Sequence, residues 1–386
     1  MTATVSHGEE LFKNAPPRRL ERRLGVPVQT GRRALLVALV AWVPLVLLAI
    51  VQSFIFGSDE LRSLLRETGV HARYLVAAPL LVLAEAICAP KLGAIANHFV
   101  HASLVPNEQR GHFDAALAST RRLLESHTAE IVVVALAYCV VVISAVSHQG
   151  NIPNWHLGGG TPPLFSMAGW WHLLISLPLL LMLIFAWMWR LALWARLLWL
   201  VSRLDLRLVA SHPDHTAGLS FLGHSLRAFA IVALALAAIA AGRSAHIVLE
   251  GGGLPTPQLA FNVSFLIALL ALFTGPLLVF APVLRDVWLR GTLEYGALAE
   301  RVGKAFEDKW LTKGKSADPA ALDQPDFSAT TDLYQVVSNV YAIRLVPVDL
   351  KDLIALAIAV LIPFVPVVLL AVPTDVIWSG IKSLLF

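Results

Sequence analysis

Long apolar runs separated by shorter polar segments dominate the chain. Seven of these runs have the length of a membrane span, and they cover residues 34–56, 74–90, 130–147, 170–189, 228–249, 259–284 and 353–372. A helix needs roughly 20 residues to cross the hydrocarbon core of a bilayer, which is about 30 Å thick. Because lipid offers the backbone no hydrogen-bond partners, each run is expected to be helical. The pattern predicts an all-α membrane protein, a bundle of about seven transmembrane helices.

The polar segments divide the chain into four parts. These are a basic N-terminal arm (1–33), a six-span region (34–284), a segment outside the membrane (285–352), and a seventh span with an interfacial C-terminal helix (353–386). Helical spacing of apolar residues predicts an amphipathic helix from Asn107 to Leu124. Segment 285–352 predicts two helices, one extending the sixth span to about Lys313 and one starting near Ser328. We expect them to form a helical cytoplasmic layer packed beneath the bundle.

The basic residues predict an orientation. Of the 30 Lys and Arg residues, 25 fall on the side of the spans that carries the N-terminus. Loops on the cytoplasmic side carry such an excess, so we expect the N-terminus in the cytoplasm. The first apolar run is too long for the core of a cleavable signal peptide and is interpreted as a span. We expect a multi-pass protein of the bacterial inner membrane.

Composition supports a membrane location over nucleic-acid binding. Hydrophobic residues make up 57% of the chain and charged residues 15%, against roughly 25% charged in soluble domains. The net charge of +4 would also suit a nucleic-acid partner. However, the basic residues lie at span ends and in loops, where they meet lipid headgroups, and they form no stripe with interleaved aromatic residues. We expect the lipid bilayer as a partner, and no nucleic acid.

Glu85 is the strongest candidate for function inside the membrane. It lies within the second run, about 18 Å from the outer surface. An unpaired carboxylate there is costly, so Glu85 is expected to be protonated or to face partners or water. Arg243 is a possible partner but sits only roughly 5 Å below the outer surface. Glu85, Asn262 and Arg243 form the candidate ion or proton pathway; local structural hydrogen bonding, for example to Asn262 or Ser264, is the alternative.

Glycine and proline interrupt the last two spans. Gly275 and Pro276 lie in the sixth run, and Pro363 and Pro366 in the seventh. Such breaks are tolerated in spans where neighbouring helices or a water-filled cavity satisfy the freed carbonyls. We interpret the four residues as a candidate hinge or gate, with a kink that serves only packing as the alternative. The prolines also leave open a re-entrant seventh segment that returns the C-terminus to the inside.

The densest polar segment connects the fourth and fifth spans. His212, Asp214 and His215 lie within four residues and are candidate ligands for a divalent metal. Their spacing is not a standard one, and Pro213 imposes an extended or turn conformation. Asp214 is equally well placed to cap a helix that starts at about Thr216. Cap-and-turn geometry is the preferred interpretation, and ligand binding and catalysis are the alternatives.

The same segment carries a resemblance. The stretch His212-Pro-Asp-His-Thr-Ala-Gly-Leu-Ser-Phe-Leu222 resembles the HPD-x-x-GGL-x-FL element of an uncharacterised family of bacterial integral membrane proteins. Further matching pieces begin at Trp199, Gly275, Glu294 and Phe306, so the resemblance covers roughly the last half of the chain. It implies a polytopic inner-membrane protein and no particular chemistry. Ala217 departs from the family pattern, which has Gly at this position, and His215 stands where the family often has other residues.

Four histidines, His148, His156, His172 and His246, are expected at the outer face. At one level they could sense pH or bind Zn²⁺, but their dispersed spacing favours interfacial residues without a shared role. The alanine-rich run 233–241 in the fifth span predicts a close contact between helices.

The sequence predicts several possible functions. It carries none of the usual catalytic motifs, so we predict no catalytic residues and no cofactor. The first hypothesis is a homo-oligomeric channel or transporter for a small ion or solute. The second is a non-transporting membrane scaffold or sensor whose segment 285–352 docks a cytoplasmic protein. A metal-dependent membrane enzyme that uses His212, Asp214 and His215 is the third and weakest.

Overall fold

The computed structural model describes residues 25, 29–56, 59–147, 154–156, 165–251, 253–311 and 326–371. Every regular element in this part of the chain is a helix. Seven helical segments are long and apolar enough to cross a membrane, which confirms the prediction of an all-α, multi-pass bundle. The basic arm before residue 25 and the predicted C-terminal helix fall outside the described residues.

Most spans are built from more than one helical piece. The first span is α2 (Thr30–Phe56), the second joins α4 (Thr68–His71), η1 (Ala72–Ala77) and α5 (Ala78–His101), and the third is α7 (His127–Ser147). The fourth joins α8 (Met167–Trp171), η4 (His172–Ser176) and α9 (Leu177–Ser202), and the fifth joins η5 (Ser220–Gly223) and α10 (His224–Gly251). The sixth joins α11 (Thr256–Thr274), η6 (Gly275–Phe280) and α12 (Ala281–Trp310), and the seventh joins α14 (Leu350–Leu361), η8 (Ile362–Phe364) and α15 (Val365–Ala371). Shorter helices connect them: α3 (Glu60–Arg66), η2 (Asn107–Gln109), α6 (Arg110–Leu124), η3 (Asn154–His156) and α13 (Asp326–Tyr341).

Prolines explain the irregular pieces. Pro79 and Pro178 each stand just after a π-helical turn, η1 and η4. A proline cannot donate to the carbonyl four residues earlier, so the preceding turn widens and that carbonyl needs another partner. The carbonyl four residues before Pro178 is that of Leu174, and it accepts a hydrogen bond from the Tyr138 hydroxyl at 3.1 Å. The sequence patterns did not predict these π-helical turns.

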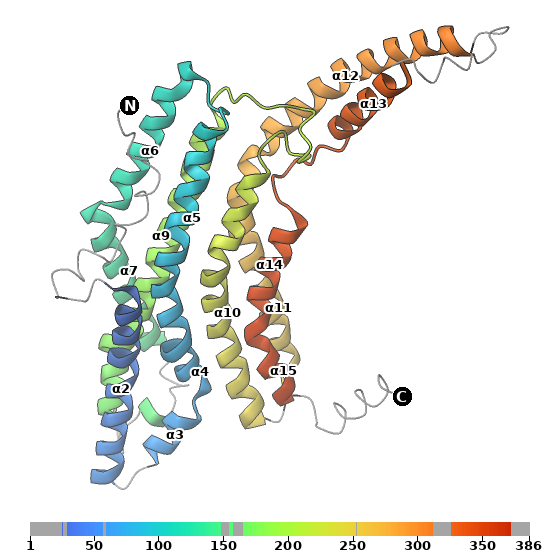
Figure 1. The fold of residues 1–386 in the computed structure, drawn as a ribbon. Coiled ribbons are helices and arrows are strands. Elements are labelled where there is room, and N and C mark those ends of the chain that lie inside the picture. Colours follow the sequence, from blue (N-terminus) through green and yellow to red (C-terminus); the bar gives the residue numbers. More distant parts are fainter. Residues whose placement is uncertain are drawn as a thin grey trace, which may run out of the picture.

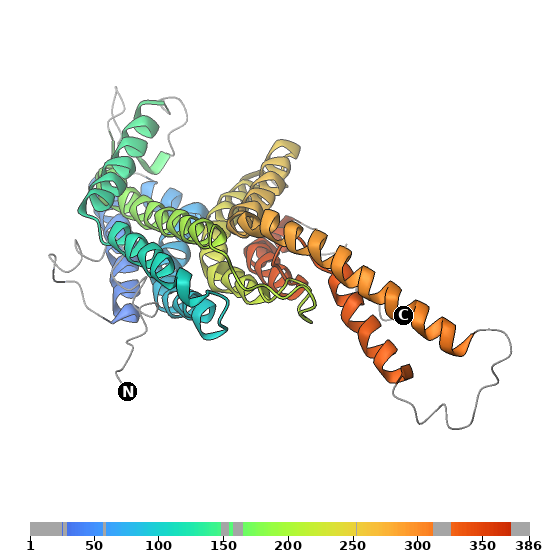
Figure 2. The same cartoon turned by 90° about the horizontal axis from the view of Figure 1, so that it is seen from above.

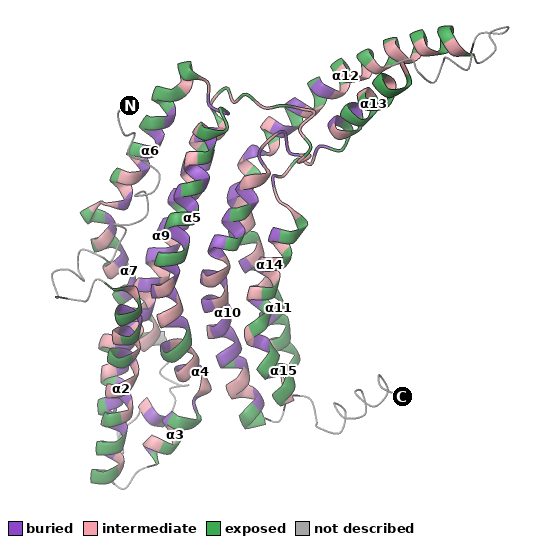
Figure 3. Cartoon of the chain, in the orientation of Figure 1, coloured by how far each residue is buried: buried purple, intermediate pink, exposed green. Residues whose placement is uncertain are grey.

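The fifth span forms the centre of the bundle. The span formed by η5 and α10 is more deeply buried than any other span of the described residues. Its small side chains, Ala233, Ala235 and Ala237 among them, are completely buried, which confirms the predicted close helix contact. Figure 3 shows buried residues concentrated on α10 and its neighbours, whereas α2 and α15 expose much of their surface. That exposed apolar surface is the part available to lipid.

The two ends of the bundle carry different connecting segments. One end of the bundle holds the end of α5, helix α6 and the 203–219 loop; we call it the basic end, and α2 begins on the same side but closer to the middle of the bundle (Figure 1). The helix predicted over 107–124 is confirmed as η2 followed by α6, which buries Phe113, Leu117 and Leu124. The seventh segment crosses the bundle from Leu350 to Ala371 and is not a hairpin.

Helices α12 and α13 form an antiparallel pair that we call the arm. Both predicted helices exist, α12 ending at Trp310 and α13 starting at Asp326. Figures 1 and 2 show the arm leaving the basic end and extending away from the bundle axis. The segment is thus helical as expected, but only its base packs against the bundle, because α12 continues straight on where the neighbouring spans end.

At the opposite end, two of the outer histidines come together. The His156 and His172 rings share a hydrogen bond at 3.1 Å, and completely buried Trp155 packs against both rings. The dispersed spacing of these histidines in the sequence did not predict this contact, and the absence of a shared role stays a prediction. His246 instead contacts Glu67 at 3.2 Å and Glu250 at 3.4 Å, and His148 lies outside the described residues. Burial and the nearby Arg73 lower the pKa of His156 to about 4, so this ring is neutral near pH 7.

Candidate functional site

Glu85 lies between two arginines inside the bundle. Its Oε2 contacts Arg33 Nη1 at 2.9 Å, and its Oε1 contacts Arg190 Nη2 at 2.5 Å. The three side chains come from α2, α5 and α9, and all three are at least 93% buried. Arg190 also lies over the Trp187 ring, with its Cζ 4.7 Å from the ring centroid. We call Arg33, Glu85 and Arg190 the triad.

The triad behaves as a structural element. Each carboxylate oxygen of Glu85 contacts one guanidinium group, and such charge-assisted contacts hold the three side chains in place. Burial of three charges is costly unless each is paired, and the pairing ties α2, α5 and α9 together at one level. The geometry favours local structural bonding of Glu85, although with arginines rather than the Asn or Ser partners that we expected.

The other residues of the predicted pathway lie elsewhere. Asn262 Nδ2 donates to Ser244 Oγ at 2.8 Å, and Gln258 Nε2 donates to Asn262 Oδ1 at 3.1 Å, so this network joins α10 and α11. Arg243 is exposed, and its Cα lies beside Gly69 in α4. Glu85, Asn262 and Arg243 therefore have separate surroundings, and the structure does not assemble them into one pathway.

Asp214 organises the 203–219 loop. Its carboxylate accepts hydrogen bonds from the backbone N–H groups of Thr216, Gly218 and Ser220 at 2.9–3.1 Å, and from the Thr216 hydroxyl at 2.8 Å. Burial acts to raise the pKa of this carboxyl, but the hydrogen bonds outweigh it and hold the pKa well below its usual range. The cap-and-turn interpretation agrees with this geometry, although the helix itself starts later, with η5 at Ser220.

The tight turn around Asp214 has a conformational cost. His215 and Ala217 have φ values of 54° and 56°, in the left-handed region that side chains with a Cβ disfavour, and Gly218 has a φ of 95°. The four bonds to Asp214 hold this conformation. Ala217 thus stands at a position where glycine, the residue of the resembling family, would fit the backbone with less strain.

The loop also holds the base of the arm. Arg344, just after α13, donates from its backbone N–H to the His215 carbonyl at 2.7 Å and from Nη2 to the Asp214 carbonyl at 3.0 Å. Gly291 in α12 packs so tightly that an added Cβ would lie 2.9 Å from both Ala210 Cβ and Val340 Cγ1. The loop, α12 and α13 therefore meet at one point, where the arm leaves the bundle.

A metal role for His212 and His215 finds no support in the geometry. His212 Nδ1 lies 2.8 Å from Asp214 Oδ1, but the Asp214 oxygens already accept four hydrogen bonds from the loop. Within the described residues, no group of three or more potential His, Cys, Asp or Glu ligands converges on one point. The Asp214 carboxylate accepts its hydrogen bonds from the loop itself, and the arrangement is that of a structural turn.

We expect Asp214→Ala to destabilise the protein by about 1–3 kcal/mol, because the backbone N–H groups of the loop, that of buried Thr216 among them, lose a charged acceptor. The folded pKa lies below the unfolded value of about 3.9, so the stabilising effect is present above that pH and is lost as the pH falls further. Thermal unfolding in detergent between pH 7 and 3 measures both effects. Asp205→Ala, an exposed carboxylate of the same loop, is the control. Equal losses in the two variants would contradict the role of Asp214.

The proline breaks are present as short 3₁₀ segments. Gly275 and Pro276 open η6. Pro363 lies in η8, and Pro366 lies in α15, the helix that follows η8 directly. In η6, Leu277 and Phe280 are completely buried, and the segment packs against α9. An added Cβ at Gly275 would meet nothing within 4 Å, so glycine is not needed there for packing. A packed kink accounts for both segments, and a hinge or gate stays a prediction.

Sequence reasoning missed Arg33 and Arg190, although a signal for them existed. Counted from the outer end of the second run, Glu85 lies deep in the membrane. Counted from the other end of the second run at Pro90, Glu85 is only five residues deep, which is about 8 Å. Arg33 directly precedes the first run and Arg190 directly follows the fourth, so both lie at a similar level.

Comparisons with known proteins give no further guidance, since no protein-family model, curated protein or solved structure matches the chain.

Proposed function

We propose that the protein is a non-transporting membrane scaffold that holds its arm in position for a cytoplasmic protein partner. The arm carries this proposal, because it is the largest part of the described structure that projects from the bundle (Figures 1 and 2). The excess of basic residues at the arm's end of the bundle supports a cytoplasmic position for it. A location in the bacterial inner membrane, which rests on the resemblance, belongs to the same proposal.

The arm has a defined internal structure. Phe327 in α13 packs against Phe306 and Trp310 of α12, with ring centroids 5.0 and 5.2 Å apart. Lys309, at the end of α12, pairs with Asp326, at the start of α13. The Tyr334 hydroxyl lies against Gly303, where an added Cβ would be 2.9 Å away. These contacts along α12 and α13 hold the pair together as one projecting element.

The outward face of α12 is apolar near the bundle and charged further out. Leu289 and Leu293 are four residues apart on one helical face, and Leu293 is 74% exposed. Glu300 and Lys304 continue the same face and pair with each other at 2.7 Å. Leu293 stands about 20 Å along α12 beyond Phe280, the last residue of η6. Exposed apolar side chains outside the spans favour contact with a partner.

A photo-crosslinking amino acid placed at Leu293, in cells that produce the full chain, tests this proposal. We expect an adduct of one discrete mass, because the apolar part of the face is the docking surface. The same label at Glu300, two turns further along the face, is the matched control and is expected to give less adduct. Absence of an adduct at both positions would overturn the proposal. An adduct with the mass of two chains would assign the face to self-association instead, in line with the homo-oligomer predicted from the sequence.

Transport of a small ion or solute is the second candidate, and the interrupted helices at η6 and η8 favour it. A flux measurement on purified protein in liposomes separates the two proposals. For a scaffold we expect wild type to show no more flux than protein-free liposomes, over a panel of ions and pH gradients. A flux that falls with Glu85→Gln, in protein that stays folded, would instead support transport through the second span.

A further inference from the structure

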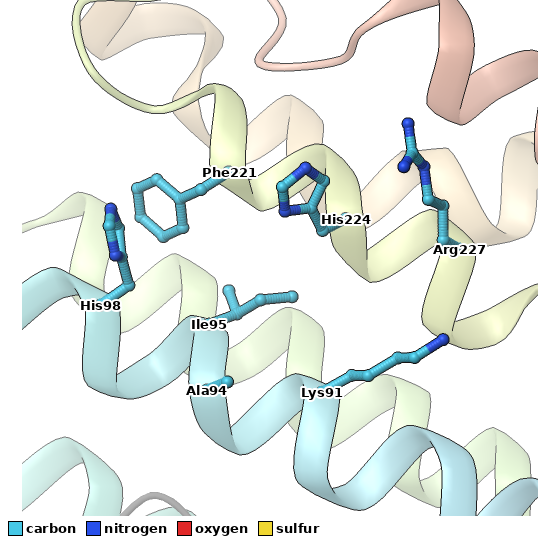
Figure 4. A pocket seen from close by; sticks show the side chains of 7 residues that line it. All are labelled: Lys91, Ala94, Ile95, His98, Phe221, His224 and Arg227. Carbon is cyan, nitrogen blue, oxygen red and sulfur yellow. The ribbon is translucent and has the colours of Figure 1, made fainter.

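A cleft of about 520 Å³ opens between α5 and α10 at the basic end. Lys91, Ala94, Ile95 and His98 line it from α5, at positions that share one helical face. Phe221, His224 and Arg227 line it from η5 and the first turn of α10. Figure 4 shows the two rows on neighbouring elements, with the Arg227 side chain directed away from the α5 row. Its volume lies in the usual range for ligand sites, roughly 300–1,000 Å³.

The charge of the cleft selects the class of ligand. None of the seven lining residues is acidic, and four carry nitrogen groups that are cationic or can become so. Arg227 Nε pairs with the buried Asp352 at the start of α14, whereas Lys91 has no ion pair with any of the described residues. His98 is held against Phe221, with ring centroids 4.4 Å apart. Donors around an open space that carries the charge of Lys91 suit an anion with several acceptor oxygens.

The position of the cleft relative to the ends of the apolar runs indicates the source of such an anion. Lys91 directly follows the second apolar run, and Arg227 directly precedes the fifth. Both therefore lie at the membrane boundary, where phospholipid phosphates are found. Basic pockets between spans at this level bind anionic headgroups.

The surface next to the cleft on its membrane side is suited to an acyl chain. On α5 the exposed stripe that includes Lys91, Ala94 and His98 continues into the membrane with exposed Ile87. On α10 the row of His224 and Arg227 continues with partly buried Ile231. The interior beneath is closed, since Cys88 Sγ donates to the Ala228 carbonyl at 2.9 Å. A ligand in the cleft is thus held at the surface, and the cleft does not continue between α5 and α10 as a pore.

We propose that this cleft binds a phosphate group, presented by an anionic phospholipid headgroup whose acyl chains lie along Ile87 and Ile231. Lys91 and His224 contact the phosphate from opposite walls, and Arg227 lies beside it. Ile95 and Phe221 form the apolar lining against the glycerol part.

Binding of lipids to the purified full chain, measured by native mass spectrometry after delipidation, tests the proposal. Phosphatidylglycerol and phosphatidylcholine with the same acyl chains are compared, and inorganic phosphate is titrated separately by calorimetry. We expect phosphatidylglycerol to bind more tightly, and Lys91→Gln to weaken its binding about fivefold. His224→Gln is expected to weaken it further, and Lys304→Gln on the arm is the matched control. Arg227 is left intact, because its removal would leave Asp352 buried without a counter-charge.

Each outcome decides a point. If only phosphatidylglycerol responds to Lys91→Gln, the ligand is the lipid. If inorganic phosphate binds and shows the same dependence on Lys91, the phosphate site holds but its source is a soluble phosphate compound. Equal binding of the two lipids without binding of phosphate would overturn the proposal. So would unchanged binding of every probe to Lys91→Gln.

Discussion

Glu85→Ala is expected to lower the free energy of unfolding by about 3–5 kcal/mol, because it leaves Arg33 and Arg190 buried without a counter-charge. Breaking a buried ion pair costs more than the pair itself contributes, since the remaining charges cannot return to water. Glu85→Gln retains an acceptor and a similar shape, so we expect a smaller loss. Reversible unfolding of the purified protein in mixed micelles measures the free energy.

A second variant separates charge from packing. Replacement of the whole triad, Arg33→Met with Glu85→Leu and Arg190→Met, removes all three charges and is expected to recover most of the stability lost in Glu85→Ala. Glu300→Ala, which removes an exposed carboxylate from the arm, is the control and is expected to show no measurable change. Unfolding of Glu85→Ala at the wild-type midpoint would contradict the structural role of the triad.

Gly242→Ala is the second large effect that we expect, a loss of about 1–3 kcal/mol from overpacking. Gly242 lies in α10 against the start of the second span. An added Cβ would overlap Ala72 Cβ and would also lie 3.3 Å from the Thr68 carbonyl oxygen. The Thr68 hydroxyl donates to the Gly242 carbonyl at 3.0 Å, so the two backbones cannot separate without loss of that bond. The unfolding midpoint in detergent measures the loss.

The neighbouring alanine offers a direct check. Ala72→Gly removes the atom that the new Cβ would strike, so the double variant Gly242→Ala with Ala72→Gly is expected to recover most of the loss. Gly275→Ala is the control in the same membrane environment, because nothing lies within 4 Å of its added Cβ. Gly242→Ala as stable as Gly275→Ala would show that α10 does not approach α4 and η1 this closely.

The spans were predictable because one strong physical requirement fixes them. A helix that crosses a bilayer needs about 20 apolar residues with internal hydrogen bonds, and a run of that length and composition can be recognised directly in the sequence. The helical nature of α6, α12 and α13 was likewise predictable from apolar periodicity. The direction of the arm was not, because periodicity shows which residues share a face and says nothing about where the helix leads after it leaves the bundle.

The candidate sites divide in the same way. Asp214 was identified as a cap from its neighbours Pro213 and Thr216, since its bonds are formed within six residues. The partners of Glu85 lie 52 and 105 residues away along the chain, so no local pattern joins them. The cleft depends on two helix faces separated by more than a hundred residues, and neither row of side chains is unusual alone. His156 and His172 were likewise separated by a loop whose path the sequence did not reveal.

By itself, the sequence determined the class of the protein: a helical membrane bundle with seven spans, a strong charge asymmetry, and a structured turn at Asp214. Only the tertiary structure decided that Glu85 pairs with two arginines, that the arm projects from the bundle, and that Lys91 and Arg227 border one cleft. The reason is physical. Burial in lipid and local hydrogen bonds act on neighbouring residues, whereas ion pairs and clefts arise where helices distant in the chain come to lie side by side.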